Sequence, residues 1–519
     1  MIGTKSEKQS TFAAGAMLLV FSAIVVKIIG VCYKIPLVHL LGAQGMGYFN
    51  AAYDVYALLC VISTTGLPVA VSVLVNRYPK QRQRIFGITL VIFSVLGLSG
   101  AAGVFLGADR IATWVGAPQA ALSLRFIAPA VLFVCISGAF KGYYQAKRNM
   151  MPTAVSQVIE AAGKLLFGLL FAHIALRSAK GAALSAAFAV LGLSVGTFLS
   201  MIYLIMLSKR ERDTEKQSAL SDRQLIKQLL IVAFPVTMGA VLSGLSKIID
   251  LSLIMRRLQD AGMAPDTAVS LYGCYSAMVI PLFNAIPMLF SSLAMPLVSH
   301  LGHAIAKEDR AAQKQILNTA FRWCAAFSIP AALGLGMMSR QALQILFSDQ
   351  ADIQTSVPLL VCICMSVPAS CMITASNAVL QAYGHAWLPM ISTAIGCVIK
   401  AISLYALCIL PGVGILAAPI STLLCCTLTV CINLMFMAGI TPSFGLAWHL
   451  IRSLIVSGIA IGAAALLYRV ILHRLDFPLL TAGIAVAVAV LLYLPIAYKC
   501  GLISTSDIKS ITKQKEKEI

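Results

Sequence analysis

The sequence has few charged residues and lacks the common signatures of soluble enzymes. Only 11% of its 519 residues are Asp, Glu, Lys or Arg, whereas a soluble protein of this size carries about a quarter. It contains no Walker A sequence, no HExxH and no GxSxG. We therefore expect a protein that is not an enzyme and that has no ATPase of its own.

The sequence also lacks the patterns of metal and nucleic-acid binding. Its fourteen cysteines are scattered through apolar stretches, and no CxxC pair stands near histidines, so no metal site is expected. We interpret the cysteines as small buried hydrophobic residues. The net charge is +20, but no pattern of alternating aromatic and basic residues accompanies it, so no nucleic-acid partner is expected.

Long apolar runs dominate the chain instead. The chain is 59% hydrophobic with a mean hydropathy of +0.90, and apolar runs of roughly 20 residues, the length that crosses a bilayer, recur from end to end. This pattern predicts an all-α polytopic membrane protein with about fourteen spans. We expect the spans near 12–40, 48–75, 85–107, 118–145, 152–174, 181–207, 227–257, 268–300, 317–340, 355–383, 388–410, 413–439, 447–472 and 476–498.

The basic residues predict the topology and the domain organisation. They are concentrated in alternate connections, such as 77–84, 147–148, 208–227 and 307–314, and in the C-terminal tail. The positive-inside rule then places both termini in the cytoplasm. We expect an N-terminal lobe at 1–207, a linker at 208–227, a C-terminal lobe at 228–440, two further spans at 441–499 and a cytoplasmic tail at 500–519.

Two stretches indicate an internal repeat. FKGYYQAKRNMMPTAVSQVIEAAGK, from Phe140 to Lys164, has a weaker copy that ends at Lys400. Gln381 follows Gln145 by 236 residues, and Lys400 follows Lys164 by the same number. Repeats of this kind build transporters whose substrate site lies between the two halves.

Isolated charges inside the predicted spans are the candidate functional residues. A charge at the bilayer centre costs about 2.5–3.5 kcal/mol, so each should face a partner or a watery cavity. The lysines outnumber the acids, and this surplus suits an anionic cargo such as a phosphate or diphosphate. The candidate substrate-binding residues are Lys27, Lys34, Lys164, Lys247 and Lys400, with Asp54, Glu160 and Asp250 as supporting or coupling acids.

Structural interpretations of the same residues stay open. Glu160 and Lys164 lie four apart and Lys247 and Asp250 three apart, so each pair can neutralise itself on one helix face. Lys27 has no such partner in its own span and is the strongest single candidate. The segments Gly66–Pro68 and Pro281–Pro296 interrupt their spans and mark either hinges or static kinks.

Three motifs carry a resemblance to a known family. They are Lys27–Gly30 with the following KIPLVHLLGAQGMGYFNAAY, then STTGLPVAVSVLVNRY ending at Tyr78, and the Phe140–Lys164 stretch. With them the chain resembles the multidrug/oligosaccharidyl-lipid/polysaccharide exporter superfamily. Within it, the chain is similar to the stage V sporulation protein B group and to the lipid II flippases.

The resemblance implies a V-shaped fold of two six-helix lobes with two additional C-terminal helices. It also implies a central cationic cavity for the diphosphate-sugar headgroup of an undecaprenyl-linked precursor, and a groove for the lipid tail along the last two helices. The lipid II flippases carry essential arginines in their first helix; Lys27 matches the first position, and Tyr33 or Lys34 matches the next. Lysine binds phosphate as a point charge and lacks the bidentate geometry of arginine.

The first functional hypothesis is a flippase for a lipid-linked oligosaccharide in a bacterial cytoplasmic membrane, serving cell-wall or spore-cortex synthesis. The alternative is a cation-coupled multidrug antiporter of the same superfamily, and a third hypothesis is a membrane scaffold for wall-synthesis enzymes. Expected partners are the lipid-linked substrate, the bilayer and cell-wall synthesis enzymes. No cofactor is expected, and a coupling monovalent cation or the membrane potential is left open as the energy source.

Overall fold

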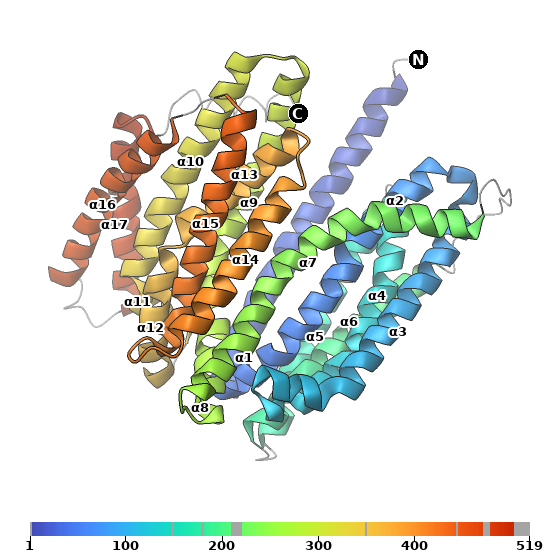
Figure 1. The fold of residues 1–519 in the computed structure, drawn as a ribbon, viewed down its shortest axis with the longest axis horizontal. Helices are drawn as coiled ribbons and strands as arrows, with labels where there is room; N and C mark the ends of the chain where they lie inside the picture. The colour runs from blue at the N-terminus through green and yellow to red at the C-terminus, as the bar shows by residue number, and fades with distance from the viewer. Residues whose placement is uncertain are drawn as a thin grey trace. The chain divides into compact units, whose positions relative to one another are not determined.

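The computed structural model describes residues 3–147, 149–177, 181–208, 221–347, 350–442, 445–470 and 478–502. Every regular element in these ranges is a helix (Figure 1), which confirms the predicted all-α class. Most of the predicted linker, residues 209–220, and most of the predicted tail, residues 503–519, lie outside the described ranges.

The helices group into two compact units, Met1–Ala277 and Met278–Ile519. The predicted lobe boundaries at residues 207 and 440 stay predictions. The first unit contains α1 (Gly3–Val61), η1 (Ile62–Gly66), α2 (Leu67–Arg77), η2 (Pro79–Gln81), α3 (Arg82–Val115), η3 (Pro118–Ala120), α4 (Ala121–Ala146), α5 (Met151–Arg177), α6 (Ala182–Ser208), α7 (Asp222–Asp260), α8 (Pro265–Gly273) and the start of η4 (Cys274–Val279). The second contains α9 (Ile280–Ala306), α10 (Arg310–Met337), α11 (Ser339–Leu346), α12 (Gln350–Cys364), α13 (Val367–Ala382), α14 (Leu388–Leu407), η5 (Gly414–Leu416), α15 (Ala417–Ile440), α16 (Leu446–Val470) and α17 (Pro478–Lys499).

The described helices have the length and composition of membrane spans. Ten stretches qualify, and the bent pair of α12 and α13, with an angle of 44°, makes an eleventh. Shorter apolar stretches, Leu450–Ala463 and Ala487–Lys499, lie in α16 and α17. The long helix α1 contains the predicted span 12–40 and the first part of the predicted span 48–75. It breaks between them at Gly42, whose φ of 63° is a left-handed value that glycine adopts without strain. The chain is thus a multi-pass membrane protein.

π-helical segments interrupt the second helix of each predicted repeat half. In the first half, η1 ends directly before α2, which carries Pro68 at its start. In the second half, η4 ends directly before α9, which carries Pro281 at its start. These are the places where the sequence suggested hinges or kinks. Each π-helical segment ends at a proline-containing helix start, so the two interruptions have the same local form.

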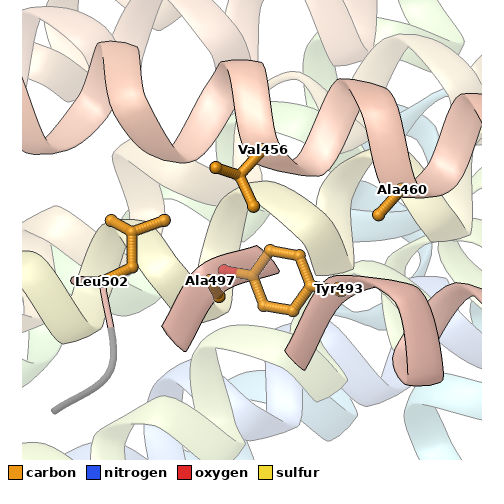
Figure 2. Close-up of a cluster of buried hydrophobic side chains, with 5 residues drawn as sticks. All are labelled: Val456, Ala460, Tyr493, Ala497 and Leu502. Carbon is orange, nitrogen blue, oxygen red and sulfur yellow. The ribbon is translucent and has the colours of Figure 1, made fainter. Parts of the chain in front are cut away.

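In the second unit, the C-terminal pair α16 and α17 is attached to α10 at a proline. Pro330 lies inside α10 and has no N–H, so the carbonyl of Ala326 loses its helical donor. The Tyr493 hydroxyl of α17 donates to that carbonyl at 2.6 Å, and Ser453 of α16 donates to the adjacent Ala325 carbonyl at 2.8 Å. Figure 2 shows the buried cluster that accompanies these bonds, formed by Val456, Ala460, Tyr493, Ala497 and Leu502.

Candidate functional site

Glycines fix the position of α5 in the first unit. A Cβ atom on Gly163 would lie 2.6 Å from the Cα of Gly196 in α6, and one on Gly196 would lie 2.7 Å from the backbone nitrogen of Lys164. Neither position has room for a side chain. The backbones of α5 and α6 therefore touch along one face of α5, and this contact sets the rotation of the helix that carries Glu160 and Lys164.

Two tyrosines of α1 hold the ammonium group of Lys164. Its Nζ lies 5.0 Å from the ring centroid of Tyr33 and 4.8 Å from that of Tyr53. Phe49 extends this aromatic surface, since its ring stacks on Tyr53 at 5.9 Å. Gly168 makes room on α5 for Tyr33, because a Cβ there would lie 2.8 Å from the ring. Ring faces attract a cation but leave its N–H donors available to an anion.

Glu160 forms its ion pair with a residue of another helix. Its Oε2 lies 3.6 Å from Nζ of Lys141 in α4, although Lys164 is one turn away on its own helix. Within the described part of the chain, Lys164 makes no ion pair. The sequence left open a Glu160–Lys164 pair, and the observed partner of Glu160 is Lys141, a residue absent from the sequence-based candidates.

Hydrogen bonds join α1 to the segment formed by α8 and η4. The Tyr272 hydroxyl donates to Oδ2 of Asp54 at 2.8 Å. Nearby, Lys34 Nζ donates to the carbonyl of Ser276 at 3.3 Å, and Asn50 Nδ2 donates to the Ser276 hydroxyl at 2.8 Å. Asp54 thus accepts a hydrogen bond within a polar site that α1 shares with α8 and η4. Tyr272 and Ser276 belong to this site, although the sequence pattern did not single them out as site residues.

The charges of this region interact with one another. Lys34 interacts electrostatically with Asp54, Lys164 and Lys247. Asp54 interacts in the same way with Lys34, Lys247 and Asp250, and Asp250 is buried in α7. We call Lys34, Asp54, Lys164, Lys247 and Asp250 the lysine cluster. The cluster contains three lysines and two aspartates, and none of the three lysines forms an ion pair with any described residue.

Two predicted residues lie elsewhere. Lys27 is exposed on α1, two helical turns or about 10 Å before Lys34. Lys400 lies in α14 of the second unit and is only 3% exposed. Their proposed contacts with substrate remain predictions.

Comparison with solved structures identifies the fold. The fold matches a lipid II flippase MurJ in an inward closed conformation, with a TM-score of 0.71 and 14% identity over 93% of this chain and 98% of that one. It also matches an inward-facing multidrug resistance MATE family transporter, with a TM-score of 0.64 and 14% identity over 82% of this chain and 94% of that one. The chain has the fold of a transporter of the MOP superfamily.

Sequence comparison shows the family of the chain. The family described as polysaccharide biosynthesis protein matches residues 12–301, more than half of the chain, and the chain belongs to it. The MatE family matches residues 265–406.

The relatives found include three proteins of Bacillus subtilis (strain 168) that match most of the chain. The uncharacterized membrane protein YabM is 26% identical over 74% of this chain and 73% of its own length. Stage V sporulation protein B is 24% identical over 80% and 81%, and the lipid II flippase MurJ is 23% identical over 75% and 76%. The similar proteins of named activity are transporters and flippases rather than catalysts, in agreement with the prediction from the sequence.

Proposed function

We propose that the chain moves a lipid-linked oligosaccharide across the bacterial cytoplasmic membrane by alternating access. The cargo is an undecaprenyl-diphosphate peptidoglycan precursor of the lipid II type, used in cell-wall or spore-cortex synthesis. Both termini lie in the cytoplasm, and cell-wall synthesis enzymes act before and after the transport step.

The observation that carries this proposal is the charge balance of the lysine cluster. Lys34, Lys164 and Lys247 lack ion-pair partners within the described residues, while Lys34 interacts with both of the other two. The ammonium group of Lys34 is thus repelled by those of Lys164 and Lys247, and a bound anion would offset this repulsion. A diphosphate supplies two negative centres and several acceptor oxygens, which match lysines acting as point charges.

The relatives support the same cargo. One carries the name lipid II flippase and another the name stage V sporulation protein B. Lys27, exposed on α1, is proposed as an outer contact of the headgroup, and Lys400 as a contribution from the second repeat half. For coupling we propose the membrane potential or a monovalent cation, with Asp54 and Asp250 as the acids that respond to it.

A second candidate function is export of organic cations. The run of Tyr33, Phe49 and Tyr53 offers aromatic faces, and Asp54 and Asp250 offer carboxylates. The MatE match and the MATE structures are consistent with such a cargo. However, Lys164 already occupies the faces of Tyr33 and Tyr53, so the aromatic site holds a cation of the protein itself.

Native mass spectrometry of the purified protein tests the proposal. The probes are lipid II, undecaprenyl phosphate and a cationic dye, applied to wild type, Lys164→Ala, Lys27→Ala and the control Lys80→Ala at an exposed position. We expect lipid II to bind wild type and the control alike, to bind Lys164→Ala at least tenfold more weakly, and to bind Lys27→Ala with an intermediate loss. Dye binding without lipid II binding would establish the exporter instead.

A further inference from the structure

The carboxylate nearest to Lys164 along the chain is held away from it. Glu160 and Lys164 are four residues apart on α5, the spacing at which a glutamate and a following lysine pair best. Instead, Oε2 of Glu160 lies 3.6 Å from Nζ of Lys141 in α4. The Lys164 ammonium lies over the rings of Tyr33 and Tyr53.

The pair between Lys141 and Glu160 sits in a half-enclosed place. The Lys141 side chain is 13% exposed and that of Glu160 is 32% exposed. Both interact electrostatically with the thiol of Cys60, which is hydrogen-bonded to Tyr56. Tyr56 and Cys60 are themselves buried, so this side of the pair is closed by weakly polar groups that offer no competing charge.

Removing Lys141 would change the partner of Glu160. With that ammonium gone, the nearest cation along α5 is Lys164, one turn away. Glu160 is 32% exposed, so water weakens the attraction between its unpaired carboxylate and the ammonium group one turn away but does not abolish it. A new Glu160–Lys164 pair would neutralise the lysine that the aromatic rings now present without a counter-charge.

We infer that Lys141 is a positioning residue, which holds Glu160 away from Lys164 and so keeps the Lys164 ammonium available to an anionic phosphate headgroup. The inference rests on the proposed function, because it assigns the cargo's phosphate to Lys164. Lys141 itself does not touch the headgroup; it acts through Glu160.

This role differs from that of a structural ion pair in one measurable respect. If the pair only stabilises the fold, then removing either partner lowers thermal stability and ligand affinity alike, and removing both partners does not restore the affinity. If Lys141 acts by diverting Glu160, then Lys141→Met weakens binding while Glu160→Gln does not. The double variant then binds as well as Glu160→Gln, because the competing carboxylate is absent.

The experiment measures binding of undecaprenyl diphosphate to the purified full-length chain by native mass spectrometry, with uncharged undecaprenol as the reference lipid. The variants are Lys141→Met, Glu160→Gln, their combination, and Lys164→Met. Arg125→Met is the matched control, because it breaks another ion pair on α4, with Asp109 of α3. Thermal stability is recorded for each variant.

We expect Lys141→Met to bind undecaprenyl diphosphate about tenfold more weakly, and Glu160→Gln, the double variant and Arg125→Met to remain within about twofold of wild type. Binding of undecaprenol should not change. If Lys141→Met does not fold, the double variant carries the test, since it buries no unpaired charge; wild-type affinity supports the inference, and a tenfold loss overturns it.

Two further outcomes separate the inference from the proposed function. Wild-type affinity in Lys141→Met, together with loss in Lys164→Met, overturns the role of Lys141 and leaves the proposed anion site standing. Wild-type affinity in Lys164→Met overturns both.

Discussion

The two copies of the repeat differ in the polar contacts that join their helices: the first copy uses an ion pair, and the second uses neutral hydrogen bonds. Lys141 and Glu160 of the first copy correspond, 236 residues later, to Asn377 and Gly396 of the second. In the first unit the pair is ionic, at 3.6 Å. In the second, Asn377 Oδ1 accepts a hydrogen bond from Nδ2 of Asn433 at 2.9 Å, and the acid is absent. The acid and its basic partner have thus both been replaced in the copy outside the lysine cluster.

The neutral network of the second copy is complete in itself. Asn433 of α15 also donates to the Ser376 hydroxyl at 2.9 Å and accepts from the Ser392 hydroxyl at 2.6 Å. All of these groups are held by uncharged partners, and buried polar groups that are fully paired stabilise a unique packing. The polar network at this place among α13, α14 and α15 is neutral, so the charges of Lys141 and Glu160 at the corresponding place in the first unit call for another explanation.

The largest difference in ligand affinity is expected between substitutions of Lys164 and Lys400, the lysines that end the two copies of the repeat. Lys164 is half-buried and lies over aromatic rings, whereas Lys400 is 3% exposed. We expect Lys164→Met to weaken binding of undecaprenyl diphosphate at least tenfold, and Lys400→Met by less than about threefold. Titration of both variants by native mass spectrometry checks this; an equal loss in the two would show that Lys400 contributes as much to ligand binding as Lys164.

An intermediate difference is expected between two glycines at close helix contacts. A Cβ on Gly196 would press on the backbone of α5 at Lys164, and one on Gly396 would press on Thr429 and Cys425 of α15. Overpacking costs about 1–3 kcal/mol at either place. We expect both Gly196→Val and Gly396→Val to lower thermal stability, but only Gly196→Val to lower anionic-lipid affinity several-fold, since it shifts Lys164. Unchanged affinity in a folded Gly196→Val protein would contradict the role of this contact.

The sequence predicted the helical fold correctly, and it singled out the charges inside the apolar runs as candidate site residues, whose role stays a prediction. Isolated charges such as Lys34 and Asp54 stand out against apolar runs, because burying them is costly. The Gly42 break lies between two predicted spans for an equally local reason, since a left-handed φ suits glycine. Such features depend only on nearby residues.

The partners of those charges were not predictable in the same way. Local spacing favoured Lys164 for Glu160, but the choice of Lys141 depends on how α4 and α5 pack. The aromatic faces around Lys164 depend on the room that Gly168 leaves for Tyr33. Lys141 was missed because it stands near the end of a predicted span, close to a basic turn that the topology rule already explained. The FKGYY motif around it was the available signal.

The smallest effect on the ligand is expected from the neutral network. Asn433→Ala removes the donor to Asn377 and Ser376 and leaves the half-buried amide oxygen of Asn377 without that partner, which costs about 1 kcal/mol. Ser392 keeps a partner, because its hydroxyl also donates to the Pro389 carbonyl at 3.0 Å. We expect a clear loss of thermal stability with anionic-lipid affinity within about twofold of wild type. A tenfold loss of affinity in the folded variant would mean that the neutral network itself helps to hold the headgroup, and the contrast between the ionic pair of the first copy and the structural network of the second would then fail.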